Sequence, residues 1–307
     1  MEQFLYIASC DPHGGILHCR LSDGGNLEML EHTALDRPMW LCRDKQYLYA
    51  LLREPFPGES GLAAFEIQAG GKLCPTGSIQ PTSGTIGCHA LAAWEHIYAV
   101  HYASGTVSRL PETILNLGEG AHPHYAVRTP EGEFLCICDL GRDCILVCTP
   151  DLVEVSRVQT APGTGPRHLV FSPDGCWAYS SDELSSTVSV FRYAQGQLTW
   201  LNSVPCIPEK FREENYPSAI RLSPDGTMLY VANRGHDSVC IFHVDGPLLS
   251  GRYFLKTEDT WPREMNLLGN FLLCGNQNCV TVFSRETGQL ASRFPVKSPW
   301  CILPADG

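Results

Sequence analysis

The sequence predicts an all-β fold, and three observations support this prediction. The 28 glycines and 22 prolines make up about one residue in six, against an average near 12%, so long helices have little room. Short apolar segments alternate with turn-forming tetrapeptides such as Ser172–Gly175. A unit made of these strands and turns recurs about every 44 residues along the chain.

The clearest repeat joins two segments in the second half of the chain. Residues 166–191 begin with Pro-Arg-His-Leu-Val-Phe and a Ser-Pro-Asp-Gly turn, and residues 217–242 follow the same pattern. Each unit contains a strand, the turn, a second strand, a loop and a third strand. In the turn, proline presets φ and glycine supplies a positive φ. We therefore assign the tetrapeptide to architecture and not to chemistry.

The same pattern fits the rest of the chain in order. We call the Pro or Gly that opens each unit its head residue; the heads are Pro38, Gly87, Pro123, Pro166, Pro217, Pro262 and Pro299. A period of ~40–50 residues with four short strands is typical of a propeller blade. The sequence thus predicts a seven-bladed β-propeller with four antiparallel strands per blade. A β-sandwich also has short strands, but it does not need this regular period.

The last unit has room for only one strand before the chain stops. Three apolar segments near the N-terminus precede the first head residue: Phe4–Ala8, Gly15–Arg20 and Asn26–Leu30. We expect them to complete the blade that begins at Pro299, so that the ring closes between the two chain ends. Closure would remove exposed sheet edges. Residues 1–307 are then expected to form a single domain.

Charge and cysteine content exclude several classes of partner. The formal net charge is −11, the wrong sign for attracting nucleic acid or an anionic membrane. No run approaches the ~18 apolar residues of a membrane span, and the acidic residue Glu2 does not suit a secretory signal. The 15 cysteines include no Cys-x-x-Cys pair, so we expect mostly buried, reduced thiols, no metal framework and no cofactor. These features favour a cytoplasmic protein.

Function is expected where equivalent positions of the repeats differ. The residues directly after the heads, the head-adjacent column, are Met39, Cys88, His124, Arg167, Ser218, Arg263 and Trp300. The residues that end the second strands, the strand-end column, are Cys10, Arg53, Tyr102, Leu140, Glu183, Arg234 and Gln277. The first strand of a blade starts on the face where the second strand ends. Both columns should therefore surround one mouth of the central channel.

This mouth combines a cluster of arginines with a histidine and a carboxylate. The candidate catalytic residues are His124, Glu183, Arg167 and Arg234, and the candidate substrate-binding residues are His122, His168, Arg263, Gln277, Asp139 and Asn233. Guanidinium groups in a protein of net negative charge favour a small anionic ligand held through carboxylate or phosphate. The structural alternative is that the charged side chains only pair across blades. His122 and His124 also allow a metal site, which the intervening Pro123 and the lack of a third ligand disfavour.

The motifs in this order resemble the seven-bladed lactonase family, which includes propeller-type 6-phosphogluconolactonases and fungal-type 3-carboxy-cis,cis-muconate lactonizing enzymes. The resemblance covers nearly the whole chain and is strongest in residues 118–244, with Ala121-His-Pro-His-Tyr, Gly165-Pro-Arg-His, Asp182-Glu-Leu and Asn233-Arg-Gly. It implies hydrolysis or reversible closure of a small anionic lactone, with His124, Arg167, Glu183 and Arg234 as the active-site set. Two positions depart from the family pattern, Asp182 and His101.

The residues leave the details of mechanism open. Water attack on the ring carbonyl needs a base, which either Glu183 or His124 could be, and arginines to stabilise the oxyanion. No Gly-x-Ser-x-Gly elbow is present, so acyl transfer to serine is not expected. A lactonizing isomerase, or a propeller that binds a metabolite or protein at this mouth without catalysis, remains an alternative.

Overall fold

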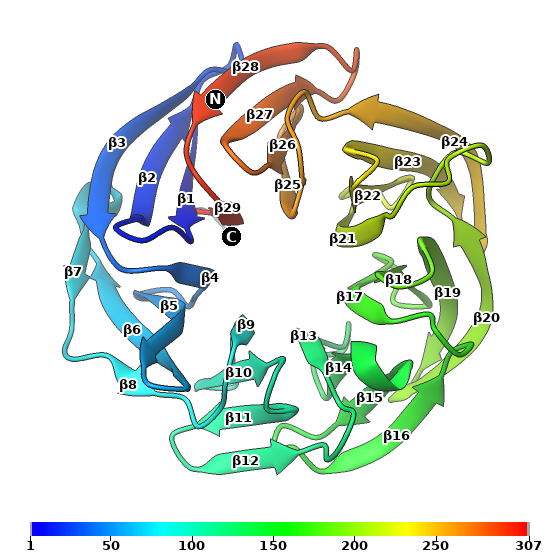
Figure 1. Ribbon diagram of the computed structural model, residues 1–307, viewed down its shortest axis with the longest axis horizontal. Helices are drawn as coiled ribbons and strands as arrows, with labels where there is room; N and C mark the ends of the chain where they lie inside the picture. Colours follow the sequence, from blue (N-terminus) through cyan, green and yellow to red (C-terminus); the bar gives the residue numbers. More distant parts are fainter. Residues whose placement is uncertain (1, 306–307) are drawn as a thin grey trace.

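The computed structural model describes residues 2–305, so Met1 and residues 306–307 of the predicted domain lie outside the described residues. Residues 2–305 form seven antiparallel sheets arranged as blades around a central axis (Figure 1). The only helical segments in this range are two short 3-10 turns, η1 (Ala69–Gly71) and η2 (Leu140–Arg142). The predicted all-β, seven-bladed propeller is confirmed. No helix in the described range is long and apolar enough to cross a membrane.

Each blade runs from one inner strand at the channel to an outer strand at the rim. The inner strands are β4 (Pro38–Arg43), β9 (Gly87–Ala93), β13 (Pro123–Arg128), β17 (Pro166–Phe171), β21 (Tyr216–Leu222), β25 (Glu264–Leu268) and β29 (Pro299–Pro304). The second strands are β5 (Tyr47–Phe56), β10 (His96–His101), β14 (Leu135–Asp139), β18 (Trp177–Asp182), β22 (Met228–Arg234), β26 (Phe271–Gly275) and β1 (Gln3–Ser9). The predicted head residues therefore lie at or next to the starts of the inner strands.

The two remaining strands of each blade continue toward the rim. The third strands are β6 (Glu59–Ile67), β11 (Thr106–Leu110), β15 (Cys144–Cys148), β19 (Thr187–Ala194), β23 (Ser238–Asp245), β27 (Cys279–Ser284) and β2 (Gly15–Leu21). The outer strands are β7 (Leu73–Pro75), β12 (Thr113–Asn116), β16 (Glu154–Gln159), β20 (Gln197–Pro205), β24 (Leu248–Lys256), β28 (Leu290–Pro295) and β3 (Leu27–Ala34). The blade of β4 carries one extra strand, β8 (Gln80–Pro81), paired with β6.

The ring closes as predicted, by pairing of the two ends of the chain. The C-terminal strand β29 is antiparallel to β1, with Ile7 opposite Ile302, and Figure 1 shows β1, β2 and β3 outside it in the same blade. The hydrophobic core lies between neighbouring blades, as where Val190 of β19 packs in one cluster with Ile220 and Val231 of the next blade. Because both faces of a middle strand are apolar, each blade must bury them against two neighbours, which a closed ring provides.

The repeated tetrapeptides form turns at the face away from the predicted mouth. In the first, the Gly175 amide donates to the Ser172 carbonyl oxygen at 2.9 Å, and Gly175 has a φ of 70° that glycine adopts without strain. All 15 cysteines are free, and only Cys74 and Cys176 are not buried. The prediction that most of the thiols are buried is therefore confirmed.

Candidate active site

Six of the seven inner strands carry a β-bulge directly after the head residue; β25 pairs with β26 without a register shift. Pro123 pairs with Asp139 and Tyr125 with Cys138, which leaves His124 as the extra residue; Arg167 has the same place between Pro166 and His168. Similar shifts fall at Met39, Cys88, Ser218–Ala219 and Trp300. A bulge bends its strand and re-aims a side chain. Backbone geometry therefore re-aims the head-adjacent residues of these six strands.

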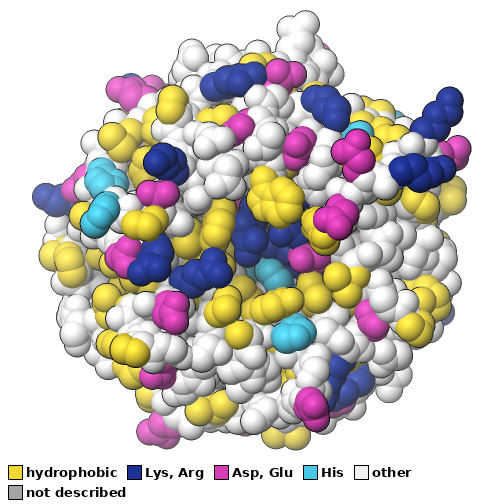
Figure 2. Space-filling model, viewed as in Figure 1, with side chains coloured by type: hydrophobic (Ala, Val, Ile, Leu, Met, Phe, Trp, Pro, Cys, Tyr) yellow, Lys and Arg dark blue, Asp and Glu magenta, His cyan; other side chains and the backbone are white. Residues whose placement is uncertain are grey.

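The two columns meet at a cavity of about 230 Å³ at the mouth of the channel. It is lined by Met39, Arg53, Ile86, Cys88, Tyr102, His124, Glu183, Arg234 and Arg263, and all of these except Ile86 belong to one of the two columns. Figure 2 shows basic and histidine side chains, with acidic ones beside them, in the hollow at the centre of this face. The predicted convergence of the columns on one mouth therefore agrees with the observed cavity.

Glu183 lies between two arginines from neighbouring blades. Its Oε2 atom is 2.8 Å from Nε of Arg167 and 2.7 Å from an Nη atom of Arg234. Burial would raise the pKa of Glu183, but the field of Arg234, Arg167 and a third arginine, Arg263, holds it below its ordinary value. The carboxylate is therefore ionised at neutral pH, and its position is set by two guanidinium groups.

Both arginines are held by further contacts. Nε of Arg234 donates to the Tyr216 carbonyl oxygen at 2.9 Å, and its guanidinium lies 5.6 Å from the Trp261 ring centroid. Arg167 is only 2% exposed, and its Nη1 lies 3.0 Å from Nε2 of His168. Guanidinium groups only donate, so this His168 nitrogen accepts. Burial and then Arg234 lower the pKa of Arg167 to about 9, which leaves it charged at neutral pH.

His124 lines the same cavity as a neutral imidazole. The side chain is buried, and burial together with Arg167 and Arg263 lowers its pKa well below the ordinary value. The Tyr102 ring packs edge-on to it, with the ring centroids 6.1 Å apart. At physiological pH His124 can therefore donate a hydrogen bond from one ring nitrogen and accept one at the other, but it carries no charge.

The candidate substrate-binding residues occupy different places. Arg263 lines the mouth cavity, and His168 lines a smaller space beneath it that also contacts Arg167. His122 stacks on Tyr102 at 4.6 Å and its Nδ1 lies 2.9 Å from the Tyr102 carbonyl oxygen. His122 is therefore placed to hold Tyr102, which itself lines the cavity.

The structure does not bring Asp139, Asn233 or Gln277 to this cavity. Asp139 Oδ1 accepts a hydrogen bond from the backbone N–H of His122 at 2.8 Å, and the side-chain amide of Asn233 donates to the Cys206 carbonyl oxygen, also at 2.8 Å. Asp139 and Asn233 each precede a strand-end residue by one position, and successive side chains of a strand point to opposite faces. Their side chains are thus directed into the blade, while Gln277 is exposed to solvent.

Four further cavity residues were not predicted as site residues from the sequence: Arg53, Tyr102, Cys88 and Met39. Their membership of the two columns was the signal that could have found them. No group of three or more His, Cys, Asp or Glu side chains in residues 2–305 is arranged to hold a metal ion. His122 and His124 therefore have no third ligand of these types in that range.

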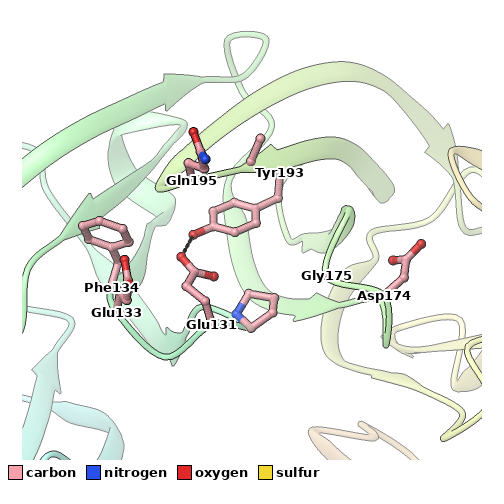
Figure 3. A pocket seen from close by; sticks show the side chains of 9 residues that line it. Glu131, Glu133, Phe134, Asp174, Gly175, Tyr193 and Gln195 are labelled. Carbon is pink, nitrogen blue, oxygen red and sulfur yellow. Dashed lines mark hydrogen bonds between the residues drawn. The ribbon is translucent and has the colours of Figure 1, made fainter.

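A second hollow, of about 610 Å³, differs in its chemistry (Figure 3). It lies by the turns at the face away from the mouth and is lined in part by Glu131, Glu133 and Asp174, with the Tyr193 hydroxyl donating to Glu131. It has no cationic lining residue. Although larger, it therefore suits an anionic ligand much less than the mouth cavity does.

Comparison with known proteins agrees with the fold. An uncharacterized protein of Staphylococcus epidermidis is 31% identical over 90% of this chain and 91% of its own length. A 6-phosphogluconolactonase of Bacillus subtilis is 29% identical over 87% of both chains. A crystal structure of a Lactobacillus plantarum protein superposes with a TM-score of 0.90 at 27% identity over the full length of both chains. The family model of the seven-bladed β-propeller lactonases matches residues 4–114 and 116–304, and the chain belongs to this family.

Proposed function

We propose that this protein hydrolyses a small lactone that carries an anionic group, with 6-phosphogluconolactone as the best candidate. The observation that supports this most is the Glu183 carboxylate between Arg167 and Arg234, at a cavity lined by His124 and two further arginines. A non-catalytic docking platform would be expected to be a broad rim, whereas this cavity is small and its charged groups converge. The relative named 6-phosphogluconolactonase supports the choice of substrate.

In the proposed mechanism, Glu183 accepts a proton as water attacks the ring carbonyl carbon. The new carbon–oxygen bond places negative charge on the former carbonyl oxygen, which Arg234 stabilises from the cavity wall. The ring carbon–oxygen bond then breaks, and the proton on Glu183 passes to the leaving oxygen. His124 stays neutral and orients the water. Arg167, buried beneath the cavity, is a positioning residue for Glu183.

The assay that tests this function measures ring opening after the spontaneous rate is subtracted. The substrates are 6-phosphogluconolactone, gluconolactone and a carboxylated muconolactone. We expect enzymatic opening of 6-phosphogluconolactone. Conversion of the muconolactone to an unsaturated open-chain acid, without turnover of the sugar lactones, would instead assign the protein as a lactonizing isomerase. No turnover of any of them would contradict the proposal.

The pH dependence should identify the base. Glu183 must be ionised to accept a proton, and its pKa lies below its ordinary 4.5, so activity should be lost only as pH falls below about 4.5. The pKa of His124 lies well below 6.5, so we expect kcat/KM to be flat between about pH 5.5 and 8. The measurement is this pH profile on unphosphorylated gluconolactone, corrected for spontaneous hydrolysis, because the phosphate of 6-phosphogluconolactone itself titrates at about pH 6. An inflection between pH 6 and 7 would contradict this assignment.

The cysteines are the basis for a proposed cytoplasmic location. All 15 cysteines are free, and disulfides are rare in reducing compartments. We therefore retain the cytoplasm as the proposed location of the enzyme.

A further inference from the structure

The charges around the mouth cavity do not balance. Arg53, Arg234 and Arg263 line it together with one carboxylate, Glu183. Arg234 and the underlying Arg167 both pair with that carboxylate, so these three groups together carry one net positive charge. Within residues 2–305, Arg53 and Arg263 take part in no ion pair. Within the described residues, the cavity therefore holds two cations with no carboxylate at ion-pair distance.

Trp300 holds these two arginines on one side of the cavity. The guanidinium of Arg263 lies 4.5 Å from the Trp300 ring centroid, and that of Arg53 lies 6.0 Å from it. Stacking on an aromatic face steadies a guanidinium while its N–H edges remain able to donate. Trp300 is itself the bulge residue of β29, the strand that closes the ring. The pair is thus presented by a rigid part of the fold.

An unpaired, partly buried cation is costly, and a ligand anion would relieve that cost. Burial, and after it the positive charge of Arg234, lowers the pKa of Arg263 to about 10. Two guanidinium groups match the two charges of a phosphate ester, whereas a carboxylate would neutralise only one. Arginine also offers planar, bidentate donation that fits phosphate oxygens.

We propose that Arg53 and Arg263, held by Trp300, form a subsite for the phosphate group of the substrate, separate from the Glu183–Arg234 pair that faces the ring carbonyl. This deepens the proposed function and rests on it. In this subsite Arg53 and Arg263 would both pair with the phosphate. The net positive charge of the Arg167–Glu183–Arg234 group is then available to stabilise the oxyanion. It also assigns a role to Arg53, whose position in the strand-end column is its only sequence signal.

The test compares Arg53→Gln with a matched control, Arg37→Gln. Arg37 is a half-buried arginine of the same rim that pairs with Asp36 and does not line the cavity. In R53Q we expect kcat/KM for 6-phosphogluconolactone to fall by about 10 to 100-fold, mainly through KM. Gluconolactone should change less than about twofold, and R37Q should leave both substrates within about twofold. Thermal unfolding checks that each variant is folded.

A binding measurement separates failure of the subsite from failure of the proposed function. Calorimetric titration with 6-phosphogluconate and gluconate needs no turnover. Binding of the phosphate ester that R53Q weakens would support the subsite even if no lactone is hydrolysed. Equal losses on the phosphorylated and unphosphorylated lactones, or no loss in R53Q, would overturn it. Equal dependence on Arg53 for a carboxylated lactone would overturn the assignment to phosphate.

Discussion

Replacing Glu183 with Gln is expected to reduce kcat for lactone opening by about 10³-fold, in the middle of the range for loss of a general base. The substitution keeps the shape of the side chain but removes the proton acceptor. It also removes the only carboxylate between Arg167 and Arg234, whose Nε and Nη atoms approach Oε2 within 2.8 Å and 2.7 Å. Activity should therefore fall on phosphorylated and unphosphorylated lactones alike, unlike in R53Q.

The measurement is kcat under saturating substrate with spontaneous hydrolysis subtracted. The matched control is Glu133→Gln, an exposed carboxylate at the second hollow on the opposite face, which should retain full activity. Far-ultraviolet circular dichroism should show an intact β-fold in both variants. Turnover of E183Q within about tenfold of the unsubstituted protein would exclude Glu183 as the base.

Replacing Glu264 with Gln is expected to destabilise the fold by about 3 kcal/mol, the lower end of the range for breaking a buried ion pair. Glu264 of β25 is only 1% exposed and pairs with Arg221 of β21, the inner strand of the neighbouring blade. A glutamine would leave the mostly buried charge of Arg221 without a partner. Equilibrium denaturant unfolding measures the change in the free energy of unfolding, provided that the transition is two-state.

A double variant separates charge burial from loss of shape. Arg221→Met combined with Glu264→Leu removes both charges, and we expect it to recover most of the lost stability, because buried pairs rarely outperform well-packed apolar residues. If E264Q changed the free energy of unfolding by less than about 0.5 kcal/mol, water would have to solvate Arg221. If the double variant were less stable than E264Q, packing and not charge would explain the loss.

The fold could be predicted almost entirely from the sequence because its signal is repeated. Each blade must bury two apolar faces, so the pattern of strand, turn and strand recurs. An ambiguous strand assignment in one unit can therefore be corrected by comparison with the equivalent segments of the other units. The head residues at Pro123 and Pro166, for instance, coincide with the starts of β13 and β17. Even the closure of the ring follows from counting strands, since β29 alone cannot form a blade.

The candidate site could be predicted in part. His124, Arg263, Glu183 and Arg234 line one cavity, as their columns suggested. Asp139 and Asn233 were placed by spacing one residue too early in their strands, and the side-chain alternation directs them into the blade. Arg53 was in the right column, but nothing local distinguishes it from Arg37, a half-buried arginine 16 positions earlier.

By itself, the sequence determined the ring, the order of its blades and the two columns that face the mouth, because these depend on local periodicity and turn chemistry. Only the tertiary structure decided which charged groups pair. Glu183 pairs with Arg167 of its own blade and with Arg234 of the next blade, while Arg53 and Arg263 share the face of Trp300. Such pairing depends on distances between residues remote in the chain, which strand bulges and ring closure set and which no local pattern records.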